Sequence, residues 1–335
     1  MSIIIPEGYK SPGSIKETEV SIKEVKDYFE RMLAKELNLT RVSAPLFVRP
    51  DSGLNDNLNG VERPVKFGIK EQNDEEVEIV HSLAKWKRKA LGDYGFKKGE
   101  GLYTDMTAIR RDEDTDNLHS IYVDQWDWEL IISKKDRNVS TLKSIVKKVY
   151  EALKNTEVFI NSRHPEIKCI LPENIKFVTT QELLDMWPDK TPKERESAAA
   201  KKYGAIFLMQ IGDKLSNGKP HDGRAPDYDD WALNGDIIVY YPILDLGLEL
   251  SSMGIRVDED SLKTQLKKAK CTERAKLPFH KAILEQKLPY TIGGGIGQSR
   301  ICMFFLKRAH IGEVQSSVWL DEDRKKAEKA GISLL

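Results

Sequence analysis

Asp236-Ile-Ile-Val-Tyr-Tyr-Pro242 and Leu248-Glu-Leu-Ser-Ser-Met-Gly-Ile-Arg256 are the two stretches of sequence that decide the fold. Each has the length of a β-strand, and Leu244-Asp-Leu-Gly247 between them supplies a turn that contains glycine. We therefore predict a β-hairpin, whose first strand opens at Asn234-Gly-Asp236. Strands that come as hairpins, separated by helical stretches, predict an α+β fold, because parallel βαβ units would alternate strand with helix.

A further strand is predicted in the middle of the chain, over Ile121–Ile132. The period-two alternation of a strand gives one face an apolar set of side chains, namely Tyr122, Trp126, Trp128, Leu130 and Ile132. The opposite face then carries Gln125, Asp127 and Glu129. This strand is predicted to pack one face into a core and to present polar groups on the other.

A long helix is predicted to begin after Ser14, because Ser14-Ile-Lys-Glu17 has the capping-box pattern. Apolar residues then recur at helical spacing as far as Leu37. Arg41–Val48, which contains Pro45, is predicted to be a strand, and another helix is predicted to begin near Gln298. The pattern indicates an antiparallel β-sheet flanked by helices, and no linker divides residues 1–335, so a single domain is expected.

Composition excludes several classes of protein. The 53 basic and 53 acidic side chains give no net field that would attract nucleic acid or an anionic membrane. The longest apolar stretch, Ile237–Leu244, is too short to cross a bilayer, and the N-terminal residues do not have the pattern of a signal peptide. The three cysteines and six histidines lack the spacing of a disulfide framework or a metal site. We expect a cytoplasmic globular protein.

The sharpest local motif is Gly293-Gly-Gly-Ile-Gly297-Gln-Ser-Arg300. Glycines let the backbone approach a ligand closely, and Arg300 in the first turn of the following helix offers a planar cation to phosphate or a purine ring. The spacing differs from that of P-loops and of the Rossmann fingerprint. Taken alone, the motif is equally well a flexible turn with a solvated arginine.

Charged residues gather at two other places. In Ala108-Ile-Arg-Arg-Asp-Glu-Asp114, Arg110 stands at a strand–loop boundary, where it could hold an α-phosphate, although such loops are more often surface turns with weak ion pairs. Asp236 and Glu249 are paired carboxylates on neighbouring strands that could hold Mg²⁺ against the phosphates of ATP, and Arg256 could clamp a substrate carboxylate. The alternative is a polar sheet face with cross-strand charge pairs.

Two more segments complete the set. His221–Trp231 places several carboxylates beside Arg224 in a loop with proline and glycine, which is typical of a lid that closes over a ligand. The alternative is a surface turn. His81–Arg88 is predicted to begin a helix after a strand over Val77–Val80, and its alternative is an exposed basic helix face.

In series, these segments resemble the ammonia-dependent asparagine synthetases, also called aspartate–ammonia ligases. The resemblance runs from the N-terminal helix to the C-terminus and is carried by His81–Arg88, Val123–Trp128, Arg224–Trp231, Ser251–Arg256 and Gly293–Arg300. It implies the fold of the catalytic domain of class II aminoacyl-tRNA synthetases, with an antiparallel sheet flanked by helices. It also implies a homodimer.

The activity implied by the resemblance is the synthesis of L-asparagine from L-aspartate, ammonia and ATP. The side-chain carboxylate of aspartate would attack the α-phosphate, giving β-aspartyl-AMP and pyrophosphate, and ammonia would then displace AMP. Because a carboxylate and a polyphosphate repel each other, we expect Arg110 at the α-phosphate, Arg300 at the adenine or γ-phosphate, and Mg²⁺ on Asp236 and Glu249. The ATP-binding backbone is expected to include Gly293, Gly294, Gly295 and Gly297.

Aspartate and ammonia also need binding groups. Gln125 and Asp127 suit the ammonium group of aspartate. The carboxylate side is expected to be met by Arg256, Ser82, Lys87 and Ser252, with Arg224 contributed by the lid. A carboxylate beside the β-carbonyl must bind ammonium and take its proton, for which Asp56 and Asp229 are the candidates. Arg110, Gln125 and these two aspartates form the expected catalytic set, and free ammonia is the expected nitrogen donor.

Two other functions stay open at this point. An aminoacyl-tRNA synthetase of the aspartyl, asparaginyl or lysyl group would need an anticodon-binding domain and tRNA as a partner, which the neutral charge argues against. A catalytically dead sensor of aspartate or adenylate would have lost a catalytic arginine or a metal carboxylate, yet Arg110, Glu249 and Arg300 are present.

Overall fold

The computed structural model describes residues 3–58 and 60–335. The helices are α1 (Ile15–Leu37), α2 (Ala84–Asp93), α3 (Val139–Arg163), α4 (Thr180–Met186), α5 (Pro192–Tyr203), α6 (Glu259–Lys268), α7 (Pro278–Leu284), α8 (Gln298–Phe305) and α9 (Asp321–Lys329). The strands are β1 (Leu39–Arg41), β2 (Phe47–Val48), β3 (Lys66–Ile69), β4 (Glu75–Ile79), β5 (Gly101–Ile109), β6 (Tyr122–Ile131), β7 (Lys176–Thr179), β8 (Ala205–Met209), β9 (Asp229–Tyr241), β10 (Leu246–Arg256) and β11 (Thr291–Gly297).

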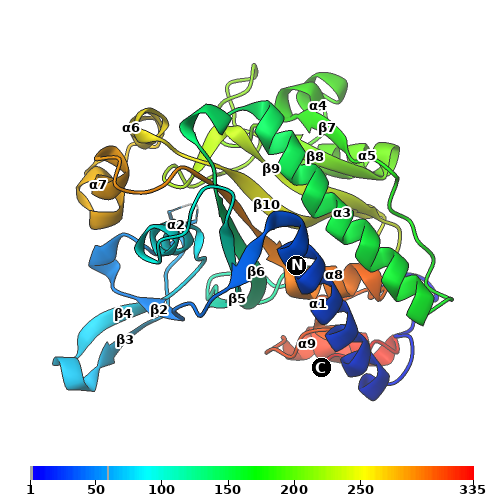
Figure 1. The fold of residues 1–335 in the computed structure, drawn as a ribbon. Helices are drawn as coiled ribbons and strands as arrows, with labels where there is room; N and C mark the ends of the chain where they lie inside the picture. Colours follow the sequence, from blue (N-terminus) through cyan, green and yellow to red (C-terminus); the bar gives the residue numbers. More distant parts are fainter. Residues whose placement is uncertain (1–2, 59) are drawn as a thin grey trace.

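An eight-stranded sheet organises the molecule, with the strand order β1-β5-β6-β11-β10-β9-β8-β7 (Figure 1). The pairs in its middle are antiparallel, but β1 pairs with β5 and β7 with β8 in parallel. The sheet is therefore mixed, which corrects the purely antiparallel sheet that was predicted, while the α+β class is confirmed. A separate three-stranded sheet of β2, β4 and β3 projects from one side of the molecule (Figure 1).

The core lies between one face of the large sheet and the helices α1, α3 and α8 (Figure 1). The predicted capping box at Ser14 and Glu17 begins α1, and the helix ends at Leu37 as expected. Phe29 of α1 packs on Trp126 of β6 with ring centroids 4.9 Å apart, and both side chains are fully buried. Each such side chain stabilises the fold by about 1.5–3 kcal/mol. The period-two prediction is thereby confirmed for Trp126, Trp128, Leu130 and Ile132, which lie in this core, but not for Tyr122, which lines the pocket described below.

The predicted hairpin is formed by β9 and β10, but its turn differs from the prediction. Gly247 lies within β10, and the left-handed residue of the turn is Asp245, with φ of +50°. A short acidic side chain tolerates this conformation, so the turn needs no glycine. The pairing of β9 with β10 is interrupted by a bulge between Glu249 and Ser251. Bulges re-aim side chains, and this one lies at the pocket described below.

Other predicted elements are corrected. Arg41–Val48 is not one strand: β1 ends at Arg41, and β2 begins at Phe47 in the other sheet, with Pro45, which has no N–H to donate, between them. Gly293–Gly297 is neither loop nor flexible turn, because it lies in β11 between β6 and β10. Within the ranges 3–58 and 60–335, no helix combines the length and apolar character needed to span a membrane.

Candidate active site

A pocket with a volume of about 450 Å³ opens on the face of the sheet opposite helices α1 and α3. Its walls come from β6, β10 and β11, the loop between β5 and β6, the start of α8, the start of α2, and the segments around residues 56 and 222–229. Most of the predicted site residues line it: Asp56, Ser82, Lys87, Arg110, Gln125, Asp127, Arg224, Asp229, Glu249, Ser252, Arg256, Gly294, Gly295, Gly297 and Arg300. Gly293 and Asp236 are not among the lining residues.

Glycines are required in β11 because side chains of the neighbouring strands occupy the space in front of it. A Cβ at Gly293 would stand 1.9 Å from Glu129 Oε2, and one at Gly295 would stand 2.6 Å from Gln125 Oε1. A Cβ at Gly294 would likewise collide with the backbone and Cβ of Met253. The glycine run therefore makes room for the polar face of β6, which was predicted from its alternation.

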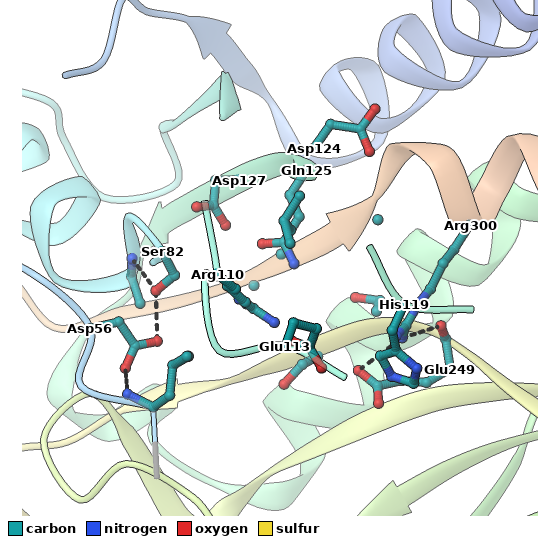
Figure 2. A pocket seen from close by; sticks show the side chains of 18 of the residues that line it. Asp56, Ser82, Arg110, Glu113, His119, Asp124, Gln125, Asp127, Glu249 and Arg300 are labelled. Carbon is teal, nitrogen blue, oxygen red and sulfur yellow. Dashed lines mark hydrogen bonds and ion pairs between the residues drawn. The ribbon is translucent and has the colours of Figure 1, made fainter. Parts of the chain in front are cut away.

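Arg110 follows directly on β5 and is half-buried in the pocket. Figure 2 shows its side chain between Asp56 and Ser82 on one side and Glu249, His119 and Arg300 on the other. Its Nε atom is buried without a hydrogen-bond partner, and within residues 3–58 and 60–335 no carboxylate forms an ion pair with it. Arg110 is thus a cation whose charge is not compensated by a fixed partner.

Arg256 has the opposite environment. Its Nε lies 3.0 and 3.1 Å from the two Glu129 oxygens, its Nη2 lies 2.7 Å from Glu129, and its Nη1 donates to Asp229. All three side chains are buried. Burial raises the pKa of Asp229, although the charge of Arg256 opposes this shift. The predicted carboxylate clamp is therefore already held by two carboxylates, and one of them is a predicted catalytic residue.

Lys87 and Asp127 were assigned to oppositely charged groups of the substrate, its carboxylate and its ammonium, but they form a buried ion pair with 2.9 Å between Nζ and Oδ1. Lys87 also donates to the Gly294 carbonyl at 2.9 Å, and the other oxygen of Asp127 accepts from the Leu83 amide at 3.1 Å. Burial lowers the pKa of Lys87 despite the nearby carboxylate. The alternative for this helix, an exposed basic face, is excluded, because Lys85, Lys87 and Arg88 are buried.

Asp56 lies at the other end of the pocket from Arg300 (Figure 2). Its Oδ2 accepts from Ser82 Oγ at 2.8 Å and its Oδ1 from the Leu58 amide at 2.8 Å. An ionised carboxylate has about four acceptor positions, so these two bonds leave it able to accept more. Asp56 has no ion pair among residues 3–58 and 60–335, so it can meet a cationic ligand, whereas the charge of Asp229 is already met by Arg256.

The predicted metal carboxylates are close enough to influence each other but are engaged differently. Asp236 pairs with Arg224, its Oδ1 is buried without a partner, and burial, followed by the charge of Glu249, raises its pKa to about 7. Glu249 lines the pocket, and its carboxylate is 4.0 Å from Arg300. Burial acts against ionisation of Glu249, but Arg300 and Lys193 outweigh it and lower its pKa.

These two carboxylates fit Mg²⁺ in the chemistry of their donor atoms. Mg²⁺ is usually held by one or two carboxylates plus substrate phosphates and water, and the unpartnered oxygen of Asp236 is a free donor. Within the described ranges, no group of three or more His, Cys, Asp or Glu side chains could hold a metal on its own. A cation at this place would therefore depend on ligands brought by the substrate.

The segment 221–231 is not an exposed turn. His221, Asp227 and Asp229 are buried, and Arg224, Tyr228 and Asp229 form part of the pocket wall. Its predicted role as a lid remains a prediction.

Some lining residues were not predicted. Asp124 accepts from the Ser299 amide and hydroxyl at 3.1 and 2.7 Å, which ties β6 to the start of α8. It directly precedes Gln125, so the strand motif contained the signal. His119 lies in the loop that follows Arg110, whereas Lys193 comes from α5, and no feature of its sequence context pointed to the pocket.

The chain was compared with known proteins. A family model described as aspartate-ammonia ligase matches residues 16–331. A protein named aspartate–ammonia ligase from Ruminiclostridium cellulolyticum is 66% identical over 100% of this chain and 99% of its own length. One with the same name from Fusobacterium nucleatum is 64% identical over 98% of this chain and 99% of its own length.

Solved structures that resemble this one are class II aminoacyl-tRNA synthetases. An asparaginyl-tRNA synthetase of Entamoeba histolytica has a TM-score of 0.64 at 15% identity, over 90% of this chain and 67% of that one. The enzyme of Pyrococcus horikoshii, complexed with asparaginyl-adenylate, has a TM-score of 0.63 at 14% identity, over 89% of this chain and 68% of that one. At these identities the likeness concerns the fold, and it confirms the predicted fold class.

Proposed function

Since the chain belongs to the aspartate–ammonia ligase family, and so makes asparagine from aspartate and ammonia, we propose that this reaction runs in the pocket through β-aspartyl-AMP. The first step releases pyrophosphate and the second releases AMP. The observation that carries the proposal is Arg110, the uncompensated cation in the middle of the pocket. A synthetase of similar fold binds asparaginyl-adenylate, and this supports an intermediate of the acyl-adenylate class here.

The charges divide the pocket into two ends. At one end, Lys87–Asp127 and Arg256 with its two carboxylates present cations and anions side by side. Such a surface suits the ammonium and α-carboxylate of an amino acid, and Gln125 adds an uncharged amide. At the other end, Arg300 and Glu249 suit a nucleoside triphosphate with its metal ion (Figure 2). Arg110 lies where the two substrates would meet.

In the proposed first step, one oxygen of the β-carboxylate attacks the α-phosphorus, and the bond to the bridging oxygen of pyrophosphate breaks. Negative charge gathers on the phosphate oxygens, and the planar guanidinium of Arg110 can donate to them and to the attacking oxygen. Because no ion pair joins this guanidinium to a carboxylate among residues 3–58 and 60–335, it would not have to leave a counter-charge before it meets the phosphate. Gly294, Gly295 and Gly297 would let the nucleotide approach the sheet closely.

We assign Asp236 and Glu249 as the residues that would hold Mg²⁺. When bound, the ion would neutralise phosphate charge and orient the leaving pyrophosphate. Arg224, which now pairs with Asp236, would be available to the substrate if the carboxylate turned to the metal.

In the proposed second step, ammonia attacks the β-carbonyl carbon, AMP leaves with the bridging oxygen, and one proton is lost from the nitrogen. Ammonia is mostly ammonium at neutral pH, so a carboxylate must first bind the cation. We assign this role to Asp56, because Asp229 is committed to Arg256. Ser82 would keep the Asp56 carboxylate oriented.

The test is the release of AMP and pyrophosphate from Mg-ATP and L-aspartate whose side-chain carboxylate carries ¹⁸O. With ammonium, we expect asparagine and AMP in equal amounts, with one ¹⁸O in the AMP phosphate, and no asparagine when glutamine replaces ammonium. Formation of ADP, or AMP without ¹⁸O, would exclude the acyl-adenylate. Release that required tRNA would favour the charging enzyme, and binding without turnover would favour the sensor.

Four general features belong to the same proposal. We propose a single catalytic domain that acts as a homodimer in the cytoplasm, without nucleic acid as a partner. Exposed Ile15 and Val20 on α1 support self-association, because both are apolar and more than half exposed. Light scattering coupled to gel filtration tests this, and a monomer at all concentrations would refute it.

A further inference from the structure

Asp227 is a buried carboxylate behind the pocket wall that the proposed reaction does not use. It is fully buried and is not among the lining residues. Its Oδ2 accepts from Lys85 Nζ at 2.9 Å and lies 2.8 Å from His280 Nε2, with Arg274 Nη1 at 3.5 Å. Lys85 and His280 are also fully buried. We call Lys85, Asp227 and His280 the buried cluster.

The buried cluster is bonded to the loop that carries Asp56. Lys85 Nζ, from the first turn of α2, also donates to the Asn55 carbonyl at 2.8 Å. The side-chain oxygen of Asn55 accepts from the amides of Asp56 and His81, each at 2.9 Å. The residue that precedes Asp56 is therefore fixed at its carbonyl by the cluster and at its side chain by the neighbouring backbone.

Contacts on the other side of the cluster fix the same loop. His280 lies on α7, and its Nδ1 would be 3.3 Å from a Cβ placed at Gly53. Gly53 has φ of +71° and is also in contact range of Leu277. The loop is thus held against α7 at Gly53 and against α2 at Asn55, which precede Asp56 by three residues and by one residue.

Asp227 also directly precedes Tyr228 and Asp229, which line the pocket. The Tyr228 carbonyl accepts from the Val257 amide at 2.8 Å, and Asp229 pairs with Arg256. One carboxylate therefore connects the wall that holds the amino acid to the loop that holds Asp56. Lys85 is the member of the cluster that bonds to the Asp56 loop, whereas the Tyr228 carbonyl and the Asp229–Arg256 pair hold the amino-acid wall without it.

The composition of the buried cluster is not what stability alone would favour. Asp227 Oδ1 and His280 Nδ1 are buried and meet no hydrogen-bond partner among residues 3–58 and 60–335. An unsatisfied buried polar atom costs about 1–3 kcal/mol, and buried ion pairs are often replaced by apolar residues without loss of stability. Departures of this kind from good packing concentrate at functional sites.

We propose that the buried cluster is a positioning device for the ammonia step: Lys85, held by Asp227 and His280, fixes the loop so that the Asp56 carboxylate faces the β-carbonyl of the adenylate. Lys85, Asp227 and His280 touch no substrate and act only through this loop. The inference rests on the proposed role of Asp56. It implies that the second step depends on the cluster and that adenylate formation does not.

The experiment compares two rates in the full-length enzyme. Aspartate-dependent exchange of labelled pyrophosphate into ATP, without ammonium, reports the first step. Asparagine formation against ammonium concentration reports the second. For Lys85→Met we expect the ammonium KM to rise, or the ammonia-dependent rate to fall, by about 10- to 100-fold, because small misplacements of reacting groups have effects of this size. Pyrophosphate exchange should change by less than about two-fold, since Arg110 and the nucleotide end are untouched.

Three further variants separate positioning from folding. His280→Gln keeps a donor towards Asp227 and should restore nearly normal ammonium dependence, whereas His280→Leu removes the donor and should behave like Lys85→Met. Glu157→Gln is the matched control, because Glu157 is a buried carboxylate remote from the pocket that accepts from the Ile170 and Leu171 amides. It should leave both rates unchanged.

Parallel loss of both rates in Lys85→Met, or the same ammonium defect in Glu157→Gln, would overturn the inference, because either result means that the cluster only stabilises the fold. Failure of the proposed function looks different. If Asp56→Asn left the ammonium dependence normal, the assignment of Asp56 would be wrong, whatever Lys85→Met does. If Asp56→Asn were defective and Lys85→Met normal, the buried cluster alone would be refuted.

Discussion

Arg110 and Arg256 line the same pocket, and their contrasting environments predict opposite consequences of removing them. Arg256 is bonded to Glu129 and Asp229, all three of them buried. Arg256→Ala would leave two buried carboxylates without their cation, and breaking a buried pair in this way costs about 3–5 kcal/mol of folding free energy. Arg110 has no ion pair within residues 3–58 and 60–335, and its buried Nε is unpartnered.

For Arg110→Ala the stability terms nearly cancel. Removing an unsatisfied buried donor relieves about 1–3 kcal/mol, which offsets the packing lost with a half-buried side chain. We therefore expect the free energy of unfolding to change by less than about 1 kcal/mol. Activity should fall steeply, because the loss of one well-placed donor at a developing oxyanion lowers kcat by about 10²–10³-fold, or 2.7–4 kcal/mol.

The assay pairs urea unfolding, followed by the fluorescence of the buried Trp126 and Trp128, with asparagine formation at saturating substrates. Arg110→Ala should unfold at nearly the wild-type urea concentration and be almost inactive, while Arg256→Ala should unfold much earlier. If Arg110→Ala were destabilised as strongly as Arg256→Ala, Arg110 would have a structural partner and the reasoning would fail. Retention of more than about a tenth of the activity would refute its role at the α-phosphate.

Three further predictions concern other parts of the molecule. Gly293→Ala should lower the unfolding free energy by about 1–3 kcal/mol, because its Cβ would collide with Glu129. Gly297→Ala, whose Cβ would have its nearest contact at 3.4 Å, should change it by less than about 1 kcal/mol. Equal urea midpoints for the two variants would contradict this. Burial lowers the pKa of Lys307 to about 8, so the folded state prefers the neutral amine, and stability should rise as the pH increases from about 8 to the ordinary lysine value of 10.5. In Lys307→Met this rise should be missing, so the difference in stability between wild type and variant should change over this pH range. Of the three thiols, the exposed Cys169 should react with a thiol reagent in the native state and the other two only after unfolding.

Much of the fold could be predicted from local sequence, because local rules determine it. The capping box at Ser14 and the alternation along β6 depend on neighbours within a few residues, and both predictions were confirmed. The parallel pairings at the two sheet edges, β1 with β5 and β7 with β8, could not be predicted in this way, since they join Leu39 to Gly101 and Lys176 to Ile206. No short-range pattern records such partners.

The membership of the pocket was easier to predict than the pairing inside it. Glu129 and Arg256 are 127 residues apart, and only the fold brings them together. Each was placed on a polar strand face, but a sequence shows a charge without showing whether a fixed counter-charge already meets it. Lys87 and Asp127 illustrate the consequence, because residues assigned to the carboxylate and the ammonium of the substrate proved to bind each other.

The division between compensated and uncompensated cations explains how one pocket can both bind and react. Arg256 and Lys87 are locked by carboxylates, so they hold their geometry before the substrate arrives, and an incoming zwitterion exchanges charge partners without creating an isolated ion. Arg110 has no such partner, so its charge is satisfied fully only when negative charge develops beside it. Interactions that strengthen in the transition state raise kcat, while those already complete in the ground state contribute to binding. By this reasoning the paired cations select aspartate and Arg110 promotes its reaction, which is why replacing the partners of Arg256 should alter KM for aspartate before it alters the chemical step.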